Sequence, residues 1–129
     1  MSDANCISLN PDGYIEATIV GDQTKMSFEH LHLATEEMMA LLQKQGKRQL
    51  GLIDVTKQGK FSPDSNKEAM LILEKLPYDK LAIFGANKVL APVINAIILA
   101  MGKSANTRMF GDRQTALAWL QETSDPDRV

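Results

Sequence analysis

The sequence has one cysteine, few aromatic side chains and no strong excess of charge of either sign. Cys6 alone cannot form an internal disulfide, which is typical of proteins from reducing compartments. Only 5% of the residues are aromatic, so few rings are available to stack on bases or sugars. A net charge of −2 provides no general attraction for nucleic acid. We therefore expect no nucleic-acid partner.

The length and the apolar content favour a single domain. The 129 residues are 44% hydrophobic, and single cores usually close within about 100–200 residues. We expect residues 1–122 to form this domain and residues 123–129 to be a flexible tail. The first ten residues lack the basic region and the apolar run of a signal peptide. We therefore expect a cytoplasmic protein, either free or peripheral to the inner face of the membrane.

Charge is distributed unevenly along the chain. Residues 1–42 carry seven acids and one base, whereas residues 43–60 carry five bases and a single acid, Asp54. The five bases are Lys44, Lys47, Arg48, Lys57 and Lys60. Such a cluster predicts either a patch that attracts phosphate or anionic headgroups, or solvated loops on both sides of a strand.

Hydrophobic periodicity and turn residues predict an α/β domain. Residues 6–21 are expected to form a β-hairpin. The apolar runs 50–55 and 81–85 are expected to form buried strands. A last strand is expected at residues 107–110, and four helices are expected at about 28–45, 62–76, 88–101 and 113–120. We expect Ser27 to cap the first of these helices and Asp112 to cap the last. Since strands separated by helices need crossover connections, we expect a four- to five-stranded, mostly parallel mixed sheet with the hairpin at one edge.

The motifs of nucleotide and phosphate sites are incomplete. Gly102-Lys103-Ser104 resembles the end of a phosphate-binding loop, but Ile97 stands where that motif requires glycine. Asp54 ends an apolar strand, as the phosphoacceptor of a receiver domain does, yet the acidic pair, hydroxyl and lysine of a receiver are missing. We expect Asp54 to cap neighbouring backbone N–H groups instead.

Catalytic and metal-binding arrangements are incomplete as well. Glu29 and His32 have the spacing of a di-iron motif, but no other helix supplies a histidine. We expect a surface pair between His32 and Glu36 instead. Cys6 has no evident base in the sequence, and no nucleophile-elbow motif occurs. We therefore expect no metal, no cofactor and no enzymatic activity.

Residues 89–101, VLAPVINAIILAM, form the most informative segment. Asn95 is the only polar side chain in a helix that is apolar nearly all round, although a helix on a sheet normally has a polar outer face. The segment is too short to span a bilayer, which takes about 20 apolar residues. The candidate contact residues are Val89, Leu90, Val93, Ile94, Ile97, Ile98 and Met101.

At 100° per residue, Val89, Val93 and Ile97 are expected on one side of this helix, and Ile94, Ile98 and Met101 on another. We expect the outer face of this helix to contact one of the following: another element, a second subunit, a protein partner, a membrane surface or a bound apolar molecule. Pro92 predicts either a kink or a late helix start. A kinked helix after a glycine-containing turn would suit a hinged lid.

Two segments carry a resemblance to a known family. GLIDVT, residues 51–56, and TRMFGDRQTALAWL, residues 107–120, resemble the SpoIIAA-like family of STAS-type domains. The resemblance extends from the hairpin to about Leu120. It implies a four- to five-stranded mixed sheet with helices, an architecture also found in CRAL-TRIO lipid carriers.

The resemblance also suggests a regulatory switch. Relatives in the anti-sigma-factor antagonist branch are phosphorylated on a serine in an Asp-Ser-Ser-Gly-like turn after the central strand, where this chain has Asp54-Val55-Thr56-Lys57. Ser62, at the start of the second helix, is the nearest substitute, because the helix dipole favours a phosphate there.

Two main functional hypotheses follow from the sequence. In the first, the protein is a non-enzymatic domain that binds a small apolar or lipid-like molecule beneath the third helix, which also contacts a membrane surface. The alternative is a regulatory protein-interaction module of the anti-sigma-factor antagonist type, switched at Ser62 or by a protein partner on the third helix. A homodimer sealed by the third helix is a further alternative.

Overall fold

The computed structural model describes residues 5–103 and 105–122, and its strands form one mixed sheet. The expected tail, residues 123–129, and Ser104 lie outside the described residues. The strands are β1 (Cys6–Leu9), β2 (Ile15–Gln23), β3 (Leu50–Phe61), β4 (Lys80–Phe84) and β5 (Thr107–Phe110). They follow one another across the sheet in chain order, with β1 antiparallel to β2 and the other neighbours parallel. The predicted mostly parallel sheet with an edge hairpin is confirmed.

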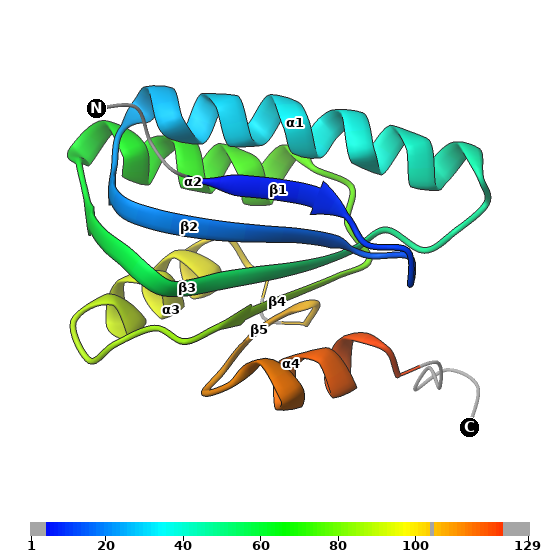
Figure 1. Ribbon diagram of the computed structural model, residues 1–129. Coiled ribbons are helices and arrows are strands. Elements are labelled where there is room, and N and C mark those ends of the chain that lie inside the picture. The colour runs from blue at the N-terminus through cyan, green and yellow to red at the C-terminus, as the bar shows by residue number, and fades with distance from the viewer. Residues whose placement is uncertain (1–4, 104, 123–129) are drawn as a thin grey trace.

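Helices cover both faces of the sheet (Figure 1). They are α1 (Lys25–Lys44), α2 (Pro63–Lys75), α3 (Leu90–Ala100) and α4 (Arg113–Leu120). Buried side chains of α1, α2 and α3 form one core with the first face of the sheet, whereas α4 forms a smaller core with the other. Because helices cover both faces of the sheet, the side chains of Leu81–Phe84 in β4 are buried whichever face they point to. This explains why the sequence of β4 is a continuous apolar run.

Helix α1 begins three residues before the predicted start, because its cap is Thr24 and not Ser27. The Thr24 side chain accepts a hydrogen bond from the Ser27 backbone N–H at 3.1 Å, and Ser27 Oγ accepts one from the Thr24 N–H at 2.9 Å. This reciprocal arrangement is a capping box, in which the second hydroxyl lies one turn inside the helix. The sequence offers both hydroxyls at the right spacing, and the prediction chose the inner one.

Strand β3 is twice as long as the predicted strand at residues 50–55, and it continues through part of the basic segment. Its pairing with β2 contains an irregularity: Thr18 pairs with Asp54 and Val20 pairs with Lys57, so β3 uses one extra residue there. Such a bulge shifts the alternation of side chains by one position. As a result Gln58 joins Val55 on the face that carries α1, α2 and α3.

Helix α3 begins late, which is one of the two outcomes predicted from Pro92. Asn87 Oδ1 accepts hydrogen bonds from the Val89 and Leu90 N–H groups, at 2.9 and 2.7 Å, and organises the turn before the helix. Pro92 is therefore the third residue of α3. Because N–H groups of the first turn have no intrahelical partner, proline is tolerated there.

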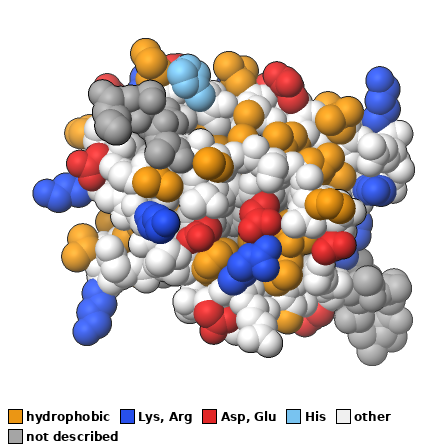
Figure 2. Space-filling model, viewed as in Figure 1, with side chains coloured by type: hydrophobic (Ala, Val, Ile, Leu, Met, Phe, Trp, Pro, Cys, Tyr) orange, Lys and Arg blue, Asp and Glu red, His pale blue; other side chains and the backbone are white. Residues whose placement is uncertain are grey.

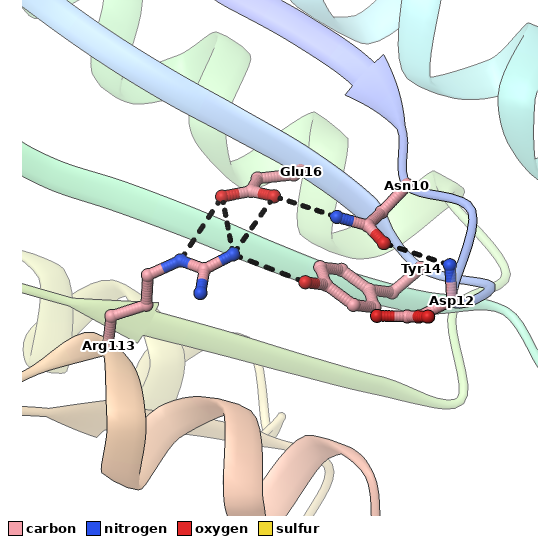
Figure 3. A network of polar contacts seen from close by, with 5 residues as sticks. All are labelled: Asn10, Asp12, Tyr14, Glu16 and Arg113. Atoms are coloured by element: carbon pink, nitrogen blue, oxygen red, sulfur yellow. Dashed lines mark hydrogen bonds and ion pairs between the residues drawn. The ribbon is translucent and has the colours of Figure 1, made fainter.

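A network of hydrogen bonds and an ion pair joins the start of α4 to the hairpin (Figure 3). Arg113 donates to Glu16 on β2, with a shortest N–O distance of 3.0 Å, and to the Tyr14 hydroxyl at 3.2 Å. Asn10 donates to the same carboxylate at 3.3 Å and accepts from the Asp12 N–H at 2.8 Å. The network joins segments that are far apart in the chain, and it places α4 on the face opposite α3.

The cap of α4 generates a pH-dependent prediction. Asp112 accepts hydrogen bonds from the Thr115 N–H at 2.8 Å and from the Thr115 hydroxyl at 2.9 Å. The backbone hydrogen bond from Thr115 lowers the pKa of Asp112. A carboxyl whose pKa is lower in the folded state stabilises the fold above its unfolded pKa, and this contribution is lost as the pH falls through its folded pKa.

We therefore expect Asp112→Asn to unfold at lower urea than wild type at pH 6, with a smaller difference at pH 3, where asparagine still caps but the carboxylate is partly protonated. Urea unfolding of both proteins at the two pH values measures this effect. An equal difference at both pH values would contradict the assignment.

Candidate functional site

Helix α3 buries one apolar face and exposes another. Leu90, Ile94, Ile97 and Ile98 pack into the core, with Met101 half-buried beside them. Outward-facing, apolar positions recur at helical spacing, and they are Val89, Pro92, Val93, Ala96, Leu99 and Ala100. We call these six residues the α3 outer stripe. Val89 is 80% exposed and Leu99 is 61% exposed, so the stripe faces solvent.

The predicted grouping of this helix was partly wrong. Ile97 lies with Ile94 and Ile98 on the buried face, not with Val89 and Val93. The sequence could not assign the faces, because apolar residues occur all around the helix and no polar side identifies the outside.

An apolar cavity of about 90 Å³ lies between α3 and the sheet, bordered by α1 and α2. Ile94, Ile97 and Ile98 form its α3 wall. Its remaining lining is Ile19, Ile53, Val55, Gln58, Leu81 and Ile83 from the sheet, Phe28 and Leu31 from α1, and Ala69, Ile72 and Leu73 from α2. The cavity is partly open to solvent, and only apolar atoms contribute to its lining surface.

The arrangement of the helices accounts for the cavity. Helices α1 and α2 pack closely against each other, whereas the α3 backbone approaches its neighbours less closely than that of any other described helix. A second apolar cavity of about 40 Å³ adjoins the first and shares four lining residues with it: Leu31, Ile53, Ile72 and Leu81. Two neighbouring, mainly apolar spaces therefore lie on the α3 side of the sheet.

Gln58 differs chemically from the other side chains that line the larger cavity. It is 6% exposed, and its Nε2 has no hydrogen-bond partner within residues 5–103 and 105–122. Leaving a buried donor unpaired costs about 1–3 kcal/mol. The sequence analysis did not identify Gln58, because only the β3 bulge places it on the cavity face.

Gln23, another buried glutamine at the end of β2, has hydrogen-bond partners for both polar atoms of its amide. Its Nε2 donates to the Val20 and Gly21 carbonyls at 3.1 and 2.9 Å. Its Oε1 accepts from Ser27 Oγ at 3.0 Å. Gln49 Oε1 and Asn66 Oδ1, outside the cavity, are also buried without a hydrogen-bond partner, so the unpaired amide of Gln58 is not particular to the cavity.

The basic segment does not form one patch. Lys44, Lys47 and Arg48 precede β3, whereas Lys57 and Lys60 lie near its end, about 30 Å away along an extended strand. Arg48 donates to the Glu122 carbonyl at 3.0 Å, near the end of α4. On the face that Figure 2 shows, Lys and Arg side chains are scattered among acidic and apolar ones.

Ser62 and Asp54 take the local roles expected of them. Ser62 is the N-cap of α2, and its Oγ accepts from the Ser65 N–H at 3.1 Å. Asp54 Oδ1 accepts from the Thr56 N–H at 2.8 Å and from the Thr56 hydroxyl. The prediction that Asp54 caps backbone N–H groups is confirmed, and phosphorylation of Ser62 stays a prediction.

His32 lies between two helices and not at the open surface. Its Nε2 is 3.8 Å from Glu36 Oε2, as the predicted pair requires, but its Nδ1 is also 4.0 Å from Glu68 Oε2 on α2. Within the described part of the chain, no group of three or more His, Cys, Asp and Glu side chains is placed to hold a metal ion. Of the helices described, none has the length and apolarity needed to cross a bilayer.

Comparison with solved structures identifies a protein with a similar fold. An uncharacterized protein of the DUF3478 family from Shewanella loihica PV-4, described as having a SpoIIAA-like fold, is 20% identical to this chain. The match has a TM-score of 0.64 and covers 93% of this chain and 96% of that one. At this level of identity the likeness concerns the fold alone. No curated protein matches the chain.

Comparison with protein families confirms the resemblance carried by the two sequence segments. The SpoIIAA-like family matches residues 14–121, from the start of β2 through α4. The mixed sheet with four described helices agrees with that match. This fold supports, in general terms, a regulatory or protein-interaction domain. The chain belongs to the SpoIIAA-like family.

Proposed function

We propose that the protein is a non-enzymatic binding domain for a small apolar or lipid-like molecule, held in the cavity between α3 and the sheet. The cavity of about 90 Å³ is the observation that supports this proposal. A dry apolar cavity of about 150 Å³ in another protein binds benzene, so in proportion the space of about 90 Å³ here suits a group of about four non-hydrogen atoms. A lipid-like molecule fits if one end occupies the cavity.

Movement of α3 provides room for the rest of such a ligand. Gly85 precedes the turn into α3 and Gly102 follows the helix, and both have positive φ angles, +87° and +65°. Glycine adopts this backbone conformation without the steric penalty of other residues. Because the α3 backbone also approaches its neighbours least closely, we propose that α3 acts as a hinged lid over the cavity.

The α3 outer stripe supports peripheral membrane association as part of the same function. Lys88 and Lys103 flank the helix, and residues 80–111 contain four bases and no acid. An apolar helix face with flanking lysines is suited to lie in the interface of an anionic membrane. In this proposal the ligand-covering helix lies at the lipid surface, on the cytoplasmic side of the membrane.

A cavity-filling variant tests the ligand site. Ala69→Leu adds three carbon atoms to a cavity-lining position of α2, whereas Ala40→Leu makes the same change at an exposed position of α1. We expect n-pentane to shift the methyl NMR signals of Ile94, Ile97 and Ile98 in wild type and in Ala40→Leu. Ala69→Leu should show no such shifts. If n-pentane did not shift these signals in wild type, or if it bound Ala69→Leu as well as wild type, the proposal would be contradicted.

A surface variant tests membrane association. Leu99→Lys changes the outer stripe, and Leu33→Lys changes an equally exposed leucine of α1; their exposed fractions are 61% and 60%. We expect wild type and Leu33→Lys to float with phosphatidylglycerol-containing vesicles, and Leu99→Lys to remain in solution. Both variants should keep their unfolding free energy within about 0.5 kcal/mol, because exposed positions contribute little. Equal flotation of the two variants would exclude the stripe as the contact.

The second candidate is a regulatory protein-interaction module, and the outer face of α1 favours it. Leu33 and Leu41 are exposed there, together with Met26 at the start of the helix. Leu33 and Leu41 also line a shallow groove with His30 and Met38. A protein partner captured by wild type and lost in Leu33→Lys would support this candidate. A homodimer through α3 would instead sediment as a dimer in wild type and as a monomer in Leu99→Lys.

A further inference from the structure

Helix α1 carries a group of exposed apolar side chains that is separate from the α3 outer stripe. Among the residues whose side chains the structure describes, six large hydrophobic ones are exposed, three on α1 and three on α3 or directly before it. Those on α1 are Met26, Leu33 and Leu41, which are 64%, 60% and 48% exposed. The neighbouring helix α2 exposes no large hydrophobic side chain. Packing against the sheet does not require apolar residues on an outer helix face, so contact with another molecule accounts for them.

The exposed residues of α1 form one stripe along the helix. Met26, Leu33 and Leu41 follow one another at intervals of about two turns, so they lie on the same side of α1. Half-buried Met38 joins Leu33 and Leu41 in lining the shallow groove. We call Met26, Leu33, Met38 and Leu41 the α1 outer stripe. It extends over about 22 Å at 1.5 Å per residue.

Acidic side chains surround the α1 outer stripe. Residues 26–43 contain Glu29, Glu36 and Glu37 and no lysine or arginine. All three are exposed, and Glu37 itself lines the groove. Within residues 5–103 and 105–122, none of them forms an ion pair with a lysine or arginine; Glu36 has only His32 beside it, at 3.8 Å. The stripe is therefore apolar area bordered by negative charge that no lysine or arginine of the described residues neutralises.

We propose that the α1 outer stripe binds a basic amphipathic helix of a protein partner. Apolar side chains of that helix would enter the groove, and its lysines or arginines would pair with Glu29, Glu36 and Glu37. Helices that dock in apolar grooves use anchors at this spacing. The length of the stripe corresponds to a partner helix of about 15–18 residues. This inference rests on the second candidate function, the protein-interaction module, and does not depend on the cavity ligand.

The acidic border favours a cationic protein partner over other apolar occupants. An anionic membrane is repelled by this border, in contrast to the α3 outer stripe, which Lys88 and Lys103 flank. A two-fold contact between the α1 stripes of two copies would place acid beside acid, because such a contact uses the same patch of both subunits. A basic helix satisfies the apolar stripe and its charges together.

Two synthetic peptides of about 18 residues test the proposal. Both carry leucines at i, i+3 and i+4 spacing; the remaining face bears lysines in one peptide and glutamates in the other. We expect the lysine peptide to bind wild type about tenfold more tightly than the glutamate peptide, and salt to weaken its binding. The lysine peptide should shift the methyl NMR signals of Met26, Leu33 and Leu41. Equal binding of both peptides, or shifts confined to α3, would overturn the inference.

Matched variants locate the contact. Leu33→Lys should weaken binding of the lysine peptide at least about tenfold, because it removes an apolar anchor and adds a like charge. Leu99→Lys makes the same change at an equally exposed position of α3 and should bind as wild type does. Glu37→Gln should weaken binding about two- to fivefold, the range for one exposed ion pair, whereas Glu74→Gln on α2 should have no effect. Equal losses in the α1 variants and their controls would contradict the proposal.

The remaining outcomes identify a different occupant. If wild type sediments as a dimer and Leu33→Lys as a monomer, the stripe binds a second copy of the chain; if Leu33→Lys no longer floats with phosphatidylglycerol-containing vesicles, it binds a membrane. Either result would overturn the inference. Tighter binding of the glutamate peptide to the stripe would overturn it but leave the protein-interaction module standing. Failure of both peptides to bind would leave the cavity ligand, which n-pentane tests, unaffected.

Discussion

The parallel pairing of β2 with the long strand β3 is the interaction on which the rest of the structure depends. A parallel pair requires a crossover connection, and α1 supplies it between these two strands. The bulge opposite Thr18 and Val20 then turns Gln58 toward the helices, and the extended end of β3 leads directly to the Ser62 cap of α2. The bulge therefore places the Gln58 side chain on the side of the sheet that carries the cavity.

Helix α3 links the interior to the surface. Its buried isoleucines close the cavity, and its outer stripe leaves apolar area in contact with water, which a monomeric domain normally limits. The two features explain why the segment is apolar nearly all round. A helix with a polar outer face would cover the sheet equally well, so the composition of α3 reflects a requirement beyond packing. In our account, this requirement is a lipid surface on one side and an apolar ligand on the other.

The sequence predicted the elements well and the site only in part. Thr107–Phe110 and the Asp112 cap are clear because a short strand, a turn and a capping residue follow one another. Ile94, Ile97 and Ile98, which line the cavity, were named from the sequence only as candidate contact residues of an apolar helix. Gln58 and the walls from α1 and α2 were not, because β3 register and helix spacing depend on tertiary contacts. The five bases appeared as one cluster in the sequence, but an extended strand separates them.

The central claim is that the apolar space beneath α3 accepts a ligand. A crystal structure determined under xenon pressure tests it most directly, because xenon occupies dry apolar cavities without needing a polar partner. The account predicts a xenon atom in contact with Ile94, Ile97 and Val55, with α3 otherwise in place. Xenon sites confined to the surface, or α3 collapsed onto the sheet with no space beneath it, would contradict the claim.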